Sequence, residues 1–296
     1  MKFLNYECLD VYLVACYIVL YYYDSNILMI NIDMKKYRSI WISDVHLGAY
    51  GCQADKLCKF LKHNDCDQMY LVGDIIDGWK LKRSWYWPQS YSNVIRRFLT
   101  AAKRGTIITY VTGNHDEFLR DWTPFKVQFG NISVVDQCDH IGVNGDHYLV
   151  VHGDMFDSVT KNYKWVSILG DIAYEALIKF NISLNRTRKW FGLGYWSLSR
   201  YIKSNAKQAA NFIFKFETHL SKHALDHNYK GVFCGHIHSP EIKPLLGIMY
   251  FNSGDFLETV SCLVERHDGV FELLIQGVDG EMRVEKTYNP WSGEIS

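Results

Sequence analysis

The chain of 296 residues is 48% apolar and 22% charged, and its formal net charge is zero. This balance is typical of a globular protein that can bury a sizeable core. The neutral charge disfavours a protein that binds nucleic acid through its phosphates, because such proteins are usually strongly basic. The length allows one large domain or two small ones.

Eight cysteines are scattered along the chain, and none forms a Cys-x-x-Cys pair. Their distribution argues against a disulfide framework and against a zinc-thiolate site, and it fits a reducing cytosol. We therefore expect free, mostly buried thiols at Cys8, Cys16, Cys52, Cys58, Cys66, Cys138, Cys234 and Cys262.

The N-terminal part differs from the rest of the chain. Residues 11–23 form an apolar and aromatic run. This run is shorter than the roughly 20 residues that span a membrane, and it lacks the basic segment that precedes the apolar part of a signal peptide. Met34 is followed by two lysines, as at a second start. We predict that residues 1–34 are an extension outside the fold of residues 35–296. A membrane-associating segment and an extra packed element are the alternatives.

From residue 35 onward, short strand-like runs alternate with helical patterns, as in layered α/β folds. Ser92 is the expected N-cap of the second helix and Gly105 its expected end. Residues 262–275 alternate loosely, as antiparallel strands do. The predicted strands are 38–43, 68–72, 106–111, 147–151, 231–234 and 249–251, and the predicted helices are 54–63 and 92–104.

Polar residues of metal-ligand type follow five of these runs. In layered α/β folds, ligands bind where loops converge at the carboxyl ends of the strands. Carboxylate, imidazole and amide groups suit Mn²⁺, Fe or Zn²⁺. A His-x-His pair alone is more often two unrelated loop histidines, so the prediction depends on the whole set. Its members are Asp-x-His at 44–46, Gly-Asp at 73–74, Gly-Asn-His-Asp at 113–116, His-Gly-Asp at 152–154 and Gly-His-x-His at 235–238.

In this order, the five motifs resemble those of the calcineurin-like metallophosphoesterases over about residues 37–255. The resemblance implies an α/β sandwich of two mixed β-sheets flanked by helices, with a dinuclear metal centre at the loop ends. The implied ligands are Asp44, His46 and His238 for one metal, Asn114, His152 and His236 for the other, and Asp74 for both.

A carboxylate shared by two cations holds them about 3.5–4 Å apart, where they can acidify a water and stabilise charge on a phosphoryl group. We expect Mn²⁺, with Fe or Zn²⁺ as alternatives. Asp74 is the expected catalytic bridge. The resemblance places His115 beside the metals, where it can stabilise the transition state or protonate the leaving oxygen.

Further polar residues of these motifs are expected around the ligands. Asp77, Asp116 and Asp154 are candidates for orienting imidazoles or loops. Asn252 and Asp255 can line the site or shape a turn.

Residues 155–228 are predicted to form a helical insert. Residues 155–230 contain twelve Lys or Arg against five Asp or Glu, with helical patterns at 165–180 and 197–222. Basic and aromatic residues on amphipathic helices suit an anionic, partly apolar substrate at a membrane surface. The alternative is a helical cap whose aromatic residues form a small core of its own.

Residues 78–89 form a predicted loop that is rich in aromatic and basic residues. A nucleobase can stack on such tryptophans. A cationic side chain such as Arg83 can hold a phosphate there.

Within the superfamily, residues 43–48, residues 73–77 and the insert look most like the UDP-2,3-diacylglucosamine hydrolases of lipid A biosynthesis. That resemblance implies cleavage to UMP and 2,3-diacylglucosamine 1-phosphate by a cytoplasmic protein, peripheral on the inner membrane. The insert then forms a lid for the acyl chains. Its candidate substrate-binding residues are Arg200, Lys203, Lys207 and Asn211.

One residue departs from that closest family. The best-studied members have Gly-Asn-Arg-Asp where this chain has His115. A related branch acting on another nucleotide, a phospholipid-like substrate or a phosphoprotein is therefore an alternative. Nucleic acid is not an expected partner. A non-catalytic scaffold on the same fold is the alternative of another class, but such a protein is expected to have lost ligands, and all seven positions are filled here.

Overall fold

The computed structural model describes residues 35–156 and 207–296, all within the unit Met34–Ser296. The predicted N-terminal extension, residues 1–34, lies outside the described residues. So do residues 157–206, the greater part of the predicted insert. Within the described part of the chain, no helix is long and apolar enough to cross a membrane.

The larger sheet is mixed. Its centre consists of β1, β2, β3 and β5, which pair in parallel, and β1 pairs antiparallel with β11. The strand order is β14-β13-β12-β11-β1-β2-β3-β5-β4. The bounds are β1 Lys35–Ile42, β2 Asn64–Val72, β3 Ile107–Val111, β4 Gln128–Phe129, β5 Ile132–Val135, β11 Ser261–Glu265, β12 Phe271–Gln276, β13 Met282–Asn289 and β14 Glu294–Ile295.

The smaller sheet is also mixed. Its three inner strands β7, β8 and β10 are parallel, and the edge strands β6 and β9 pair antiparallel with them. The strand order is β6-β7-β8-β10-β9. The bounds are β6 Gln137–Ile141, β7 His147–Val151, β8 Gly231–Cys234, β9 Glu241–Leu245 and β10 Ile248–Asn252.

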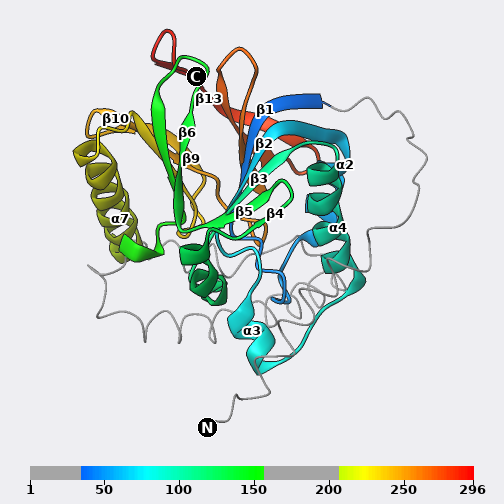
Figure 1. Ribbon diagram of the computed structural model, residues 1–296. Coiled ribbons are helices and arrows are strands. Elements are labelled where there is room, and N and C mark those ends of the chain that lie inside the picture. Colours follow the sequence, from blue (N-terminus) through cyan, green and yellow to red (C-terminus); the bar gives the residue numbers. More distant parts are fainter. Residues whose placement is uncertain (1–34, 157–206) are drawn as a thin grey trace, which may run out of the picture. The chain divides into compact units, whose positions relative to one another are not determined.

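Helices cover the outer faces of the two sheets (Figure 1). Helices α2 (Ala54–His63) and α4 (Gln89–Lys103) share a core with the larger sheet. Helix α7 (Lys207–Asp226) shares another core with the smaller sheet, and a third core lies between the sheets. The described residues thus form the predicted sandwich of two mixed sheets flanked by helices.

A stack of aromatic rings joins the two sheets. Trp41 of β1 lies parallel to Phe233 of β8 with ring centroids 4.2 Å apart, and Tyr70 of β2 stacks on Trp41 at 5.2 Å. Phe251 of β10 continues the stack at 4.3 Å from Phe233. The rings are buried, so they contribute both apolar burial and ring-ring attraction. β1 and β8 are therefore held together just before the loops that carry Asp44 and His236.

Two local predictions need correction. Helix α4 begins after Pro88 rather than Ser92, whose hydroxyl instead accepts a hydrogen bond from the indole of Trp87. Residues 78–89 are not a loop throughout, because helix α3 spans Gly78–Arg83. The Asp77 carboxylate caps α3 by accepting a hydrogen bond from the backbone N–H of Lys80, which satisfies a donor that a helix start otherwise leaves free.

The second half of α7 is a layer of the sandwich. Phe216, Leu220 and Ala224 are buried against the smaller sheet. The lid predicted for about 155–228 can therefore comprise only residues before these. The six cysteines of the described residues are free, as predicted, and three of them are buried: Cys66, Cys234 and Cys262.

The aromatic stack between the sheets predicts a large stability effect. Phe233→Ala removes a buried ring and leaves a cavity, which should lower the free energy of unfolding by about 3–5 kcal/mol. Phe125→Ala, at a ring that is 75% exposed, should change it by less than about 0.5 kcal/mol. Urea unfolding followed by circular dichroism measures both. Equal effects would show that the stack does not hold the sheets together.

Candidate metal centre

All seven candidate ligands lie just after the carboxyl ends of parallel strands. Asp44 and His46 follow β1, Asp74 follows β2, and Asn114 follows β3. His152 follows β7, and His236 and His238 follow β8. The loops are tied together by backbone hydrogen bonds from Asp44 to Gly73 (3.1 Å) and from His46 to Asp74 (2.9 Å). Because neighbouring parallel strands end at the same sheet edge, the side chains converge there.

Five of the seven candidate ligands have a left-handed backbone. Their φ angles lie between 50° and 68°, a region that non-glycine residues rarely adopt. Such residues persist where surrounding structure enforces them, and they cluster at functional sites. The residues are Asp44, His46, Asp74, His236 and His238.

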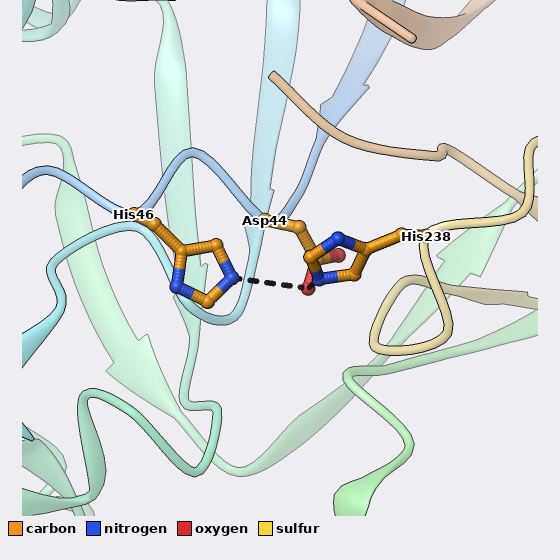
Figure 2. A group of neighbouring side chains, drawn as sticks. All are labelled: Asp44, His46 and His238. Carbon is orange, nitrogen blue, oxygen red and sulfur yellow. Dashed lines mark ion pairs between the residues drawn. The ribbon is translucent and has the colours of Figure 1, made fainter. Parts of the chain in front are cut away.

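Asp44, His46 and His238 form one group of potential metal ligands. Figure 2 shows the three side chains pointing toward one another from two loops. The Asp44 Oδ1 atom lies 3.1 Å from His238 Nε2 and 3.8 Å from His46 Nε2. Asp44 is completely buried, so its charge needs a counter-charge within this group.

Asp74, His152 and His236 form a second group. The His152 Nε2 atom lies 3.4 Å from Asp74 Oδ2. The opposite ring nitrogen, Nδ1, donates to the carbonyl of Val72 at 2.8 Å. This hydrogen bond orients the ring and aims Nε2 at the group, as carbonyl partners do for metal-binding histidines.

Asp74 lies between the two groups. Its Oδ2 atom is 3.4 Å from His152 Nε2 in the second group and 3.8 Å from His46 Nε2 in the first. Its Oδ1 atom accepts a hydrogen bond from the backbone N–H of His115 at 2.8 Å. Asn114 directly precedes His115 in the chain. Because Asp74 Oδ2 faces a histidine of each group, the Asp74 carboxylate faces both groups, as a bridging ligand must.

Asp77 contacts two imidazoles at the side of the site. Its Oδ2 atom lies 3.3 Å from His46 Nδ1, and its Oδ1 atom lies 3.1 Å from His115 Nδ1. Ligand-type atoms of these three residues also lie within 4.8 Å of one another. Since His46 turns its other nitrogen toward Asp44 and Asp74, we interpret Asp77 as the group that orients both rings.

The remaining polar candidates hold loops. Asp116 accepts hydrogen bonds from the Ile75 backbone and the Tyr110 hydroxyl. Asp154 pairs with Arg120 at 2.7 Å. Asn252 donates to the Gly235 carbonyl at 2.9 Å, beside the site. Asp255 accepts from the backbone of the turn that follows it, so it shapes that turn.

Two glycines make room for these side chains. A Cβ atom on Gly235 would lie 2.4 Å from Asp44 Oδ2 and 2.5 Å from Ser43 Oγ. A Cβ atom on Gly73 would lie 2.3 Å from the ring of His152. Larger residues at these positions would displace the ligands.

The electrostatics of the site are those of buried carboxylates among histidines. Burial would raise the pKa of Asp44 and Asp74, but the histidines around each carboxylate, with His238 foremost at Asp44 and His152 foremost at Asp74, together hold both pKa values well below the usual range. Burial would lower the pKa of His152, but the charge of Asp74 raises that pKa to about 10. Burial opposes charge on His46 too, but the nearby carboxylates of Asp44, Asp77 and Asp74 raise its pKa well above the usual value.

Four buried ligand atoms make no hydrogen bond to any group in residues 36–156 and 212–296. They are Asp44 Oδ1, His46 Nε2, Asn114 Oδ1 and His152 Nε2. Leaving such an atom unsatisfied costs about 1–3 kcal/mol, so the convergence of four such atoms from three strand ends calls for a further partner. Nitrogen and oxygen donors around buried carboxylates fit a divalent cation. The residues present therefore form a divalent metal-binding site.

Of the candidate substrate-binding residues, the structure describes only the side chain of Arg83, so this group stays a prediction. Arg83 is exposed at the end of α3. Arg200 and Lys203, and the side chains of Lys207 and Asn211, lie outside the described residues. Sequence reasoning missed one contact: Trp79 packs on His115 with ring centroids 4.4 Å apart. The only signal was that Trp79 lies two residues after Asp77.

Comparison with known proteins agrees with this geometry. A family model described as "Calcineurin-like phosphoesterase" matches residues 37–240. No curated protein matched the chain.

Several solved structures show a distant similarity. They include a single mutant of Vps29 from Entamoeba histolytica (12% identity, 85% of this chain and 99% of that chain covered, TM-score 0.42). Another is Yfce, a phosphoesterase from E. coli (14% identity, 82% and 95% covered, TM-score 0.41). A third is a predicted phosphoesterase from Streptococcus pneumoniae (13% identity, 83% and 92% covered, TM-score 0.37). At these TM-scores the similarities carry no argument about activity.

Removing the central carboxylate should abolish tight metal binding. Asp74→Asn keeps the shape of the side chain but removes the charge that faces both groups, so divalent-metal affinity should fall by more than about tenfold. Asp139→Asn is the control, because Asp139 is an exposed carboxylate on β6. Metal titration with elemental analysis measures the change. Unchanged affinity in Asp74→Asn would contradict this assignment.

Metal binding should release protons near neutral pH. The metal-free protein holds protons on His46 and His152, whose pKa values are raised, whereas a metal-bound imidazole nitrogen carries none. Affinity should therefore increase with pH up to about pH 10, where His152 loses its proton without metal. Calorimetric titration in two buffers of different ionisation enthalpy measures the release. A buffer-independent enthalpy would contradict it.

Proposed function

The chain belongs to the calcineurin-like phosphoesterase family, and we propose that it cleaves a phosphoester or pyrophosphate bond at this centre. The observation that carries the proposal is the position of Asp74 between two groups of ligand atoms. Two cations held on either side of one carboxylate suit in-line displacement at phosphorus.

We assign the ligands by group. The first metal takes Asp44, His46 and His238, which the structure brings together. The second takes His152 and His236 from the other group, with Asn114, whose buried carbonyl oxygen makes no hydrogen bond among the described residues. Asp74 serves both. We propose Mn²⁺ as the cation, with Fe or Zn²⁺ as alternatives, since the donor set lacks the thiolates of structural zinc sites.

The chain's own residues supply the rest of the chemistry. When bound, the cations stabilise negative charge on the phosphoryl group and acidify a water. His115 turns Nε2 toward the same space, 4.0 Å from Asp74 Oδ2. As the phosphorus–oxygen bond breaks, Nε2–H donates its proton to the leaving oxygen. Asp77, at Nδ1, keeps the ring in that orientation.

The proposed substrate is UDP-2,3-diacylglucosamine, cleaved to UMP and 2,3-diacylglucosamine 1-phosphate in lipid A biosynthesis. Support comes from the motifs at residues 43–48 and 73–77, which resemble those of the corresponding hydrolases. An acylated sugar nucleotide lies at a membrane, so we propose a cytoplasmic protein that is peripheral on the inner membrane. The cluster of Lys80, Lys82 and Arg83 on α3 supplies positive charge for an anionic substrate or lipid.

His115 favours a second candidate substrate class. Diphosphate cleavage expels a phosphate group, which is a weak base and needs little protonation. An ester of an alcohol expels a strongly basic alkoxide, for which a histidine proton donor is valuable. The presence of His115, where the resembled hydrolases have arginine, therefore favours a phosphoester with an alcohol leaving group.

A scaffold without activity is disfavoured because all seven ligand positions are filled.

A substrate panel with Mn²⁺ tests the proposal. Bis-p-nitrophenyl phosphate should be hydrolysed, and UDP-2,3-diacylglucosamine should be cleaved faster if it is the substrate. Single-stranded DNA should remain intact.

His238→Ala should lower kcat by about a hundredfold or more, because it removes a ligand of the first metal. His267→Ala is the control, since His267 is half-exposed and outside both groups. Full activity of His238→Ala would refute the assignment.

A further inference from the structure

We propose that Trp79, held by Glu117, positions the imidazole of His115 for proton delivery to the leaving oxygen. Trp79 is thus a positioning residue rather than a platform for a nucleobase. The proposal rests on the hydrolase function proposed above and deepens it, because it names a residue on which the proton donor depends.

Three side chains enclose the His115 ring. Asp77 lies at Nδ1, with Oδ1 3.1 Å away. His46 meets the ring edge-on, with centroids 4.6 Å apart and planes at 87°. Trp79 covers the ring with centroids 4.4 Å apart and planes at 36°. With 13% of its side chain exposed, the ring has little freedom, and Nε2 is the polar atom that faces Asp74.

Trp79 is itself fixed. Its indole N–H donates to Glu117 Oε1 at 3.1 Å. Glu117 begins the 3₁₀ helix η1 (Glu117–Phe125), two residues after His115. The backbone N–H of Gly78 donates to the carbonyl of His115 at 2.9 Å. The start of α3 and the start of η1 are thus linked through both backbone and side chains.

This arrangement explains why the positioning requires an indole. Asp77 contacts only one edge of the His115 ring, which leaves rotation about that contact open. The indole, with its plane at 36° to that of His115, hinders this rotation, and the hydrogen bond to Glu117 keeps the indole beside the ring. Small displacements of a proton donor lower catalytic rates strongly, by about a hundredfold for 1 Å.

A substitution at Trp79 can test proton delivery without changing a contact to a candidate ligand. A substitution at Asp77 cannot. Asp77 contacts both His115 and the candidate ligand His46. Among the described residues, the ring and hydrogen-bond partners of Trp79 are His115 and Glu117, and neither is a candidate ligand. Changing Trp79 should therefore disturb the proton donor and leave the metals in place.

The decisive measurement is the dependence on leaving group. A p-nitrophenolate leaves as a stable anion, whereas an unsubstituted phenolate is a stronger base and gains more from the proton of His115. In Trp79→Ala, kcat for diphenyl phosphate should fall by about 10- to 100-fold, and kcat for bis-p-nitrophenyl phosphate by less than about threefold. Trp79→Phe keeps a ring beside His115 but loses the hydrogen bond to Glu117, so its kcat for diphenyl phosphate should lie between those of wild type and Trp79→Ala.

A second measurement does not depend on activity. Diethyl pyrocarbonate modifies exposed imidazoles, and peptide mapping resolves His115 from the other histidines. In metal-free protein, His115 should react several-fold faster in Trp79→Ala than in wild type. Trp291→Ala is the matched control, because it also removes a hydrogen-bonded indole but at the far C-terminal hairpin. It should change neither the labelling nor the leaving-group dependence.

The outcomes separate this inference from the proposed function. Equal loss on both esters, reduced metal content, or unchanged labelling of His115 in Trp79→Ala would overturn the positioning role. Inactivity of wild-type protein with Mn²⁺ toward every phosphoester and pyrophosphate would instead contradict the hydrolase, and the labelling rates would still decide how His115 is held.

Discussion

The candidate metal centre depends on the buried carboxylates of Asp44 and Asp74, which the fold places after the ends of neighbouring strands. Their ion-pair partners within residues 36–156 and 212–296 are all histidines. Histidine can give up its proton and become a metal ligand, whereas lysine and arginine would keep the cations out. The negative charges of the two carboxylates are therefore balanced by protons on histidines when metal is absent. Divalent cations balance them when they bind.

Such a cluster is unfavourable without a rigid frame. Five candidate ligands have left-handed backbones, each of which costs about 1–3 kcal/mol of folding free energy. Burial of the carboxylates adds to this cost. Favourable interactions in the rest of the fold offset it. Parallel pairing fixes the strand ends, and the aromatic stack of Trp41 and Phe233 locks the two sheets just before the site. The candidate ligands are thus preorganised by the strands that precede them and by the contacts between the two sheets.

The candidate ligands could be located in the sequence because strand ends are local features, and the fold brings six of their side chains into two groups. It failed where tertiary contacts decide. Ser92 has a capping residue type, but Trp87 uses its hydroxyl. Helix α3 is too short for a periodic pattern, and it depends on the cap from Asp77. The sequence pattern around Phe216 is compatible with a lid helix and with a core helix. Only the contact of Phe216 with the smaller sheet distinguishes the two.

Asp77 links the candidate ligand His46 to the proposed proton donor His115. One carboxylate meets the outer nitrogen of His46 and the outer nitrogen of His115, and it also caps α3. Helix α3 in turn begins with Gly78, whose N–H holds the His115 backbone, and with Trp79, which covers the His115 ring. A movement of α3 would therefore shift the proton donor first and the ligand His46 through Asp77. The cluster of Lys80, Lys82 and Arg83 thus lies on the helix whose first residues contact the backbone and the ring of His115.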